Sequence, residues 1–192
     1  MPNEARIKLL ARVARTAASS SAVPESAPSS ILSLAAAAYG SRPSEDATVP
    51  TGFDPLAVVL FEAIVEGAFV VANADGVFDD EEKRVFQQVV VAACGGAVGP
   101  QQIAALVSDL GDQLAEDGLD ARIEALTGVV SRKDHAVEVL RIAALLAQAS
   151  EDVSAVERET LEKLASRWDL GGGAVDSALA DVKAALAAAA AA

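Results

Sequence analysis

Carboxylates gather in two short segments that repeat each other 75 residues apart. The first, residues 72–82, reads Ala-Asn-Ala-Asp-Gly-Val-Phe-Asp-Asp-Glu-Glu, and the second, residues 147–157, reads Ala-Gln-Ala-Ser-Glu-Asp-Val-Ser-Ala-Val-Glu. Carboxylate oxygens are the ligands that hard cations prefer, and Ca²⁺ takes about six to eight oxygens. The chemistry that these segments suggest is therefore the binding of a divalent cation.

The first segment does not match an EF-hand loop. Asp75, Val77 and Asp79 follow the start of such a loop, but Asp80 stands where the loop needs glycine, and Phe86 stands where it needs glutamate. A solvated acidic face at a helix start explains the same carboxylates without a cation.

Helix capping is that alternative explanation. Asp79 and Ser154 are typical N-cap residues, and Glu82 and Glu157 follow three residues later, in the capping-box position. The glutamate charge also complements the positive end of the helix dipole. Each segment therefore predicts the end of one helix, a short turn and the start of the next helix.

From residue 53 onwards, N-cap residues, prolines and glycines recur at the expected starts and ends of helices, which predicts seven helices with short connections. Asp54 precedes the first of them, and Ser131 with Asp134 forms a variant capping box before the fifth. The expected ranges are 54–74, 79–94, 100–118, a short helix from 120, 131–149, 154–171, and 174–186 fraying into polyalanine. Residues at helical spacing are expected to face the core: Val85, Val89, Ala92, Val137, Leu140, Ala144, Ala147, Leu161, Leu164 and Trp168.

Residues 1–52 are predicted to be an N-terminal arm and linker with short helical segments at 1–18 and 31–39, before a helical domain at 53–192. The arm is basic, and its candidate partner-binding residues are Arg6, Lys8, Arg12 and Arg15. Three hypotheses explain the basic charge of this arm: it contacts an anionic membrane surface, docks on the acidic core, or docks on a partner protein. We expect protein docking, in a homo-oligomer or a larger assembly.

Charge is distributed unevenly along the chain. Residues 51–192 carry ten Lys/Arg against twenty-four Asp/Glu, within a formal net charge of −13 for the whole sequence. Such a domain repels phosphate backbones, which argues against nucleic-acid partners. Cys94 is the only cysteine, so neither an intrachain disulfide nor a cysteine metal cage is expected. A cytoplasmic location fits this cysteine content.

The most apolar stretch, residues 56–74, contains Glu62 and Glu66. A charge at the bilayer centre costs about 2.5–3.5 kcal/mol, so we expect a buried helix and no transmembrane segment. A buried carboxylate must be paired, protonated or bound to a metal. We expect Glu62 and Glu66 either to lie at a polar edge of the helix or to pair with Arg132, Lys133 or Arg141.

Catalytic residues are scarce. His135 is the only histidine, which argues against Ser/His or Cys/His catalysis and leaves no cofactor expected with certainty. His135 and Glu138 have the reverse order of a di-iron motif. Residues 171–173 are three glycines after a helix, which indicates a helix end rather than a phosphate loop. We therefore do not expect an enzyme.

The first acidic segment resembles the TerB-like family of tellurite-resistance proteins, in which a helix ends in Ala-x-Ala-Asp-Gly before an apolar residue and an acidic helix start. That family also includes a domain of membrane-tethered DnaJ co-chaperones. The resemblance covers residues 53–187 and implies a compact all-α bundle of seven helices in two pseudo-repeated halves. Ser150 and Glu151 depart from the pattern, because the family often has Asp-Gly there.

The resemblance also implies a role in chemical-stress resistance and a metal site at the two segments. The metal candidates that it implies are Asp75, Asp79, Glu82, Glu151, Asp152 and Glu157. Our first hypothesis is a non-enzymatic acidic module that binds a protein partner. A divalent-metal sensor or buffer and a structural component of an assembly are the alternatives.

Overall fold

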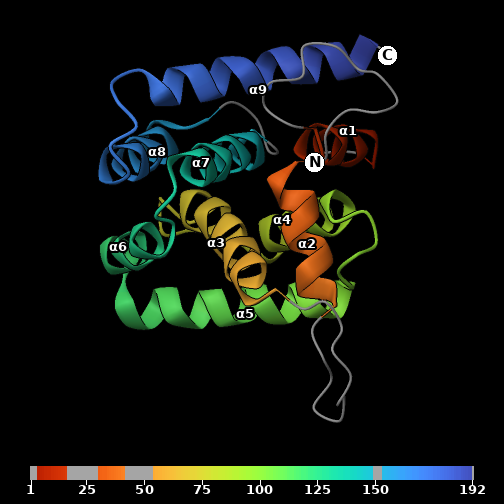
Figure 1. Ribbon diagram of the computed structural model, residues 1–192, viewed down its shortest axis with the longest axis horizontal. Coiled ribbons are helices and arrows are strands. Elements are labelled where there is room, and N and C mark those ends of the chain that lie inside the picture. The colour runs from red at the N-terminus through yellow and green to blue at the C-terminus, as the bar shows by residue number, and fades with distance from the viewer. Residues whose placement is uncertain (1–3, 17–29, 42–53, 149–152, 192) are drawn as a thin grey trace.

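The computed structural model describes residues 4–16, 30–41, 54–148 and 153–191. These residues form nine α-helices and no strand, which confirms the all-α fold class (Figure 1). The helices are α1 (Glu4–Ala14), α2 (Ile31–Gly40), α3 (Pro55–Ala72), α4 (Asp80–Ala93), α5 (Pro100–Asp117), α6 (Leu119–Val129), α7 (Lys133–Ala147), α8 (Ala155–Arg167) and α9 (Ala174–Ala191).

Side-chain caps begin three of these helices where the sequence predicted them. Asp54 accepts a hydrogen bond from the Leu56 amide at the start of α3. Asp79 and Ser154 each form a complete capping box, at α4 and α8. Because a capping box occupies amides that the helix cannot pair itself, it fixes where the chain enters the helix.

Several predicted helix boundaries were wrong. Helix α8 ends at Arg167 instead of near residue 171. Ser131 does not cap α7: the N-cap is Arg132, and Asp134 instead pairs with the Arg132 guanidinium at 2.6 Å. Helix α9 does not fray after Leu186 but continues to Ala191. Alanine has the highest helix propensity, and the Arg12 guanidinium donates to the Ala189 carbonyl, so the polyalanine end stays helical.

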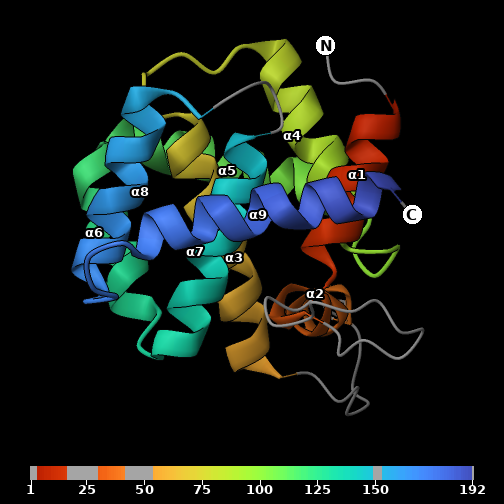
Figure 2. The same cartoon turned by 90° about the horizontal axis from the view of Figure 1, so that it is seen from above.

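Helices α3 and α7 cross at the centre of the molecule and form its most extensive helix–helix contact. Figure 1 shows α9 along one side of this pair and α5 along the opposite side, and Figure 2 shows α9 running across α7. Most predicted core positions are buried, among them Val89, Leu140, Leu161 and Leu164. Val137 is an exception at 47% exposed, because it lies on the outer face of α7.

Helices α1 and α2 pack into the same core as the later helices. Leu10 and Val13 of α1 and Leu32 and Tyr39 of α2 are buried. The Tyr39 and Phe61 rings lie 4.6 Å apart between their centroids. Because nine helices share one core in the described chain, the predicted count of seven is not confirmed.

The two pseudo-repeated halves are not confirmed either. Helix α4 packs on α1 and α5, whereas α8 packs on α3, α6, α7 and α9. The helices that follow the two acidic segments thus have different neighbours, although both begin with a capping box.

A close approach joins α2 to the connection between α4 and α5. A Cβ atom on Gly40 would lie 1.7 Å from the Ala97 carbonyl oxygen. Only a residue without a side chain fits there, so Gly40 lets the end of α2 touch the backbone of the neighbouring loop.

Within the described residues, α3 alone has the length and apolar composition of a membrane span, with a mean hydropathy of 2.0. More than half of this helix is buried inside the molecule. Because a buried core helix has the same composition, α3 is weak evidence for a span.

Candidate functional site

The first acidic segment is a tight corner stabilised by its own carboxylates. Asp75 accepts a hydrogen bond from the Val77 amide at 2.9 Å. Asp79 accepts from the Glu82 amide at 2.8 Å, and Glu82 accepts from the Asp79 amide at 3.1 Å. All three metal candidates in this corner therefore already bind backbone amides.

An aromatic cluster anchors this corner to the core. Phe78 precedes the N-cap, and its ring packs edge-on against Phe69 of α3 and Phe86 of α4, with centroids 5.5 and 6.0 Å apart. Edge-to-face pairs of this kind stabilise by about 0.5–1.5 kcal/mol beyond their buried area. The corner is thus rigid for reasons that need no ligand.

Residues 149–152 of the second segment lie outside the described residues, and they include the candidates Glu151 and Asp152. Ser154 accepts from the Glu157 amide at 3.2 Å, and Glu157 accepts from the Ser154 amide at 2.7 Å. Val153 packs against the core as Phe78 does.

No group of three or more His, Cys, Asp or Glu side chains comes together as a metal site within the described ranges. Asp75, Asp79, Glu82 and Glu157 do not form one cluster there. The metal hypothesis for the full set of six carboxylates stays a prediction.

Two buried ion pairs hold the carboxylates that lie inside the bundle. Glu66 of α3 accepts hydrogen bonds from Nε and Nη2 of Arg122 on α6, at 2.9 and 2.5 Å. Arg122 also contacts Asp117 at 3.1 Å, so one guanidinium joins α3, α5 and α6. Burial raises the pKa of Glu66, against the opposite effect of Arg122. The predicted partners Arg132, Lys133 and Arg141 were wrong for Glu66.

The second buried pair lies within α7. Glu138 accepts from Nε and Nη2 of Arg141 at 2.8 and 2.9 Å, and both residues are buried. Arg141 also donates to the carbonyls of Val13 and Ala14 at the end of α1, at 3.4 and 3.5 Å. This pair therefore anchors α1 to α7, and the Glu138 carboxylate is occupied by the Arg141 guanidinium.

Two arginines of α1 and Arg15, which directly follows α1, contact the ends of three other helices. Arg6 donates to the Gln148 carbonyl after α7, Arg12 to the Ala189 carbonyl of α9, and Arg15 to the Ala92 carbonyl of α4. Cations are favourable at helix C-termini, where carbonyls lack partners. Lys8, the fourth candidate, pairs with Glu4 at 2.6 Å.

Arg12 and Arg15 each use only part of their hydrogen-bonding capacity at these helix ends. An arginine has five N–H donors, and a hydrogen bond to a carbonyl leaves its charge unneutralised. No described carboxylate pairs with Arg12 or Arg15, whose side chains are exposed.

Cys94 is buried at the end of α4, and burial raises its pKa to about 12. A thiol nucleophile must be deprotonated, so Cys94 is unreactive near neutral pH.

A surface groove of about 540 Å³ lies between α6 and α8. Lys163 contacts Asp120 across it at 3.5 Å, and Arg167 contacts Glu124 at 3.8 Å beside it. Its charged groups thus pair with one another and connect the two helices, instead of converging on an open site.

The exposed face of α5 carries charge of one sign only. Helix α5 contains no lysine or arginine, and Asp109, Asp112 and Glu116 are exposed at spacings of three and four residues. None of these three carboxylates forms an ion pair or a hydrogen bond with the described chain. We call these three residues the α5 acidic stripe. This stripe was not predicted from the sequence. The pattern that indicates it is three acids on one face of a helix that contains no cation.

Comparisons with family models, with curated proteins and with solved structures find no match to this chain.

Proposed function

We propose that this protein is a non-enzymatic interaction module that binds a cationic protein surface through the α5 acidic stripe. The observation that carries the proposal is that Asp109, Asp112 and Glu116 form one exposed row with no cation beside them in α5. Other exposed carboxylates, such as Glu81, Asp134 and Glu162, pair with arginines of the same chain. An exposed row of like charges attracts a surface of opposite charge and steers its approach.

The position of α5 supports this proposal. It forms one edge layer of the molecule, and its inner face is fixed by the buried Ile103, Val107 and Leu110 (Figure 1). The stripe is therefore held on a rigid helix packed against the core. A rigid charged surface attracts a partner with a smaller entropy cost than a mobile one.

The family resemblance supports a narrower proposal. The turn at Asp75 and Gly76, followed by a capped acidic helix, favours a TerB-like stress-resistance protein of the cytoplasm. The capping box at Ser154 agrees with a related second corner. The family assignment, the location and any link to tellurite resistance remain proposals on these residues.

Affinity capture with the full-length protein tests the proposed function. The triple variant Asp109→Asn, Asp112→Asn, Glu116→Gln should lose the partners that the wild type retains from a native extract, because it removes three unpaired charges. A matched control neutralises three exposed acids outside α5: Asp80→Asn, Glu159→Gln and Asp181→Asn. Equal capture by the triple variant and the wild type would refute the proposal.

A further inference from the structure

A second charged row, opposite in sign to the α5 acidic stripe, lies along α1 and its C-terminal end. Lys8 and Arg12 of α1 and Arg15, which directly follows α1, are exposed and have spacings of four and three residues. The Arg15 amide donates to the Ala11 carbonyl at 3.3 Å, so Arg15 continues the last turn of the helix. Residues at these spacings share one face of a helix. We call these three residues the α1 basic stripe.

The two stripes match in spacing as well as in charge. Read backwards, Glu116, Asp112 and Asp109 also have spacings of four and three. With a rise of about 1.5 Å per residue, each stripe is about 10 Å long. An antiparallel arrangement of α1 and α5 therefore faces Lys8 with Glu116, Arg12 with Asp112, and Arg15 with Asp109.

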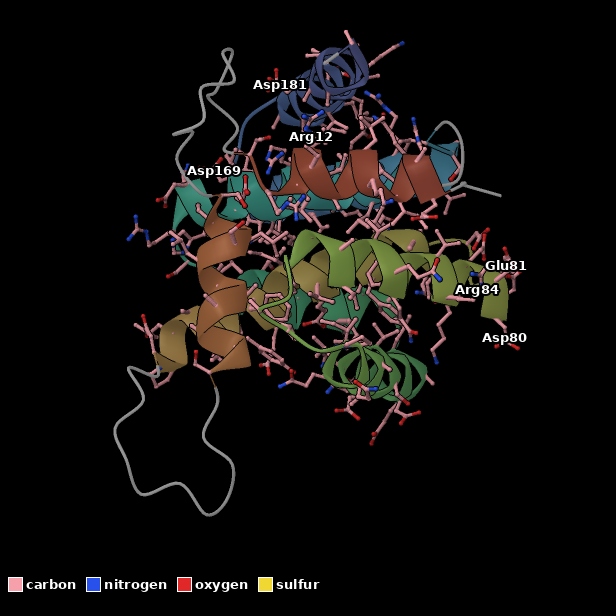
Figure 3. The ribbon with its side chains drawn as sticks, turned by 90° about the vertical axis from the view of Figure 1, so that its right-hand side faces the viewer. Arg12, Asp80, Glu81, Arg84, Asp169 and Asp181 are labelled. Atoms are coloured by element: carbon pink, nitrogen blue, oxygen red, sulfur yellow. The ribbon has the colours of Figure 1, made fainter. Side chains whose placement is uncertain are left out.

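One molecule cannot bring its own stripes together. Figures 1 and 3 show α4 between α1 and α5, and α4 packs on both. Any contact between the stripes must therefore join two molecules.

We propose that the partner of the α5 acidic stripe is the α1 basic stripe of a second copy of this chain. This inference rests on the proposed function and names its partner. Because the two surfaces differ, the contact is head-to-tail and leaves each copy with one stripe open, so copies add in chains or close into a ring. Three exposed ion pairs give weak association, which depends on salt concentration.

Sedimentation equilibrium of the full-length protein tests the association. At about 0.01 M salt, where the Debye length is about 30 Å, the average mass should rise with protein concentration. At about 1 M salt, where that length is about 3 Å, the mass should fall to that of one chain. A single-chain mass at every concentration in low salt would overturn the inference.

Charge exchange tests which residues meet. Lys8→Glu and Glu116→Lys should each weaken the association about tenfold, because each replaces an attraction with a repulsion. The double variant restores an opposite pair and should return to within about threefold of the wild type. The control Asp80→Lys changes the net charge as Glu116→Lys does but lies on α4, so it should not weaken the association. A double variant as weak as the single variants would contradict the antiparallel arrangement.

Carbodiimide cross-linking of mixed ¹⁴N- and ¹⁵N-labelled protein provides an independent test. The reagent condenses a carboxylate with an amine, so mixed-isotope peptides should join Glu116 to Lys8. Mixed-isotope links confined to other residues would refute this contact.

Failure of this inference and failure of the proposed function have different signatures. If the protein remains monomeric but captures a different protein only when the α5 acidic stripe is intact, the self-association is wrong and the proposed function stands. If neutralising that stripe changes neither the capture nor the average mass, both are wrong.

Discussion

Glu66 and Glu138 place two carboxylates inside a bundle whose core is mostly apolar. The sequence indicated that Glu66 needs a cation, because a buried charge without a partner is unfavourable. It did not indicate which cation, since Arg122 is 56 residues away and reaches Glu66 only when α6 lies beside α3. Glu138 and Arg141 are three residues apart on one helix, a spacing that favours an ion pair, although this pair was not predicted.

The Arg122→Met variant should lose about 3 kcal/mol of unfolding free energy near pH 7, because it leaves Glu66 buried without a counter-ion. Burial raises the pKa of Glu66. A carboxyl with a raised folded-state pKa favours the fold when protonated, and this contribution is lost as pH rises through that pKa. The deficit of the variant should therefore shrink as pH falls. Urea unfolding at several pH values measures it.

The double variant Glu66→Gln, Arg122→Met is the control for this prediction. A neutral amide at position 66 removes the titrating group, so the pH dependence assigned to it should disappear. A deficit of Arg122→Met that stays constant from neutral to acid pH would show that Glu66 is not its cause.

At the scale of the helices, the crossing of α3 and α7 depends on a missing side chain. A Cβ atom on Gly67 would lie 2.5 Å from Cγ1 of Val139. The sequence predicted both helices and their buried faces, but glycine within a helix is ordinarily unfavourable, and nothing local indicated its use. Its role became visible only when the two helices were placed against each other.

The Gly67→Ala variant should destabilise the protein by about 1–3 kcal/mol, although alanine is the better helix former, because the added methyl group overpacks the crossing. Thermal unfolding, followed by circular dichroism at 222 nm, measures the change. Adding Val139→Ala makes room for the methyl group, so the double variant should be more stable than the sum of the single effects allows. Strictly additive effects would show that the two positions do not meet.

At the scale of the whole molecule, α1 packs into the core, although the sequence predicted an arm over residues 1–52. The sequence indicated an arm, because α1 is short, basic and separated from the next apolar segment by a Ser- and Pro-rich stretch. In the structure, Leu10 and Val13 are buried, and Arg6, Arg12 and Arg15 reach the ends of α7, α9 and α4. The α1 segment thus connects the C-terminal ends of α7, α9 and α4 through hydrogen bonds.

Leu10→Ala should lower the global unfolding free energy by about 2–5 kcal/mol, because Leu10 is fully buried. Lys8→Ala, on the exposed face of the same helix, should change it by less than about 0.5 kcal/mol. Chemical denaturation monitored by Trp168, which is buried in the same core, reports the global transition. A wild-type midpoint for Leu10→Ala would mean that α1 does not contribute to the core.

Local sequence patterns were enough to predict where most helices of this protein form, because caps, prolines and apolar spacing act within a few residues of one another. The capping boxes at Asp79 and Ser154 and the start of α3 at Pro55 were predicted on this basis. The packing of distant helices brings Arg122 to Glu66, places α1 in the core and leaves the acidic row of α5 exposed without a cation. Those features depend on contacts between residues far apart in the chain, which local patterns do not encode.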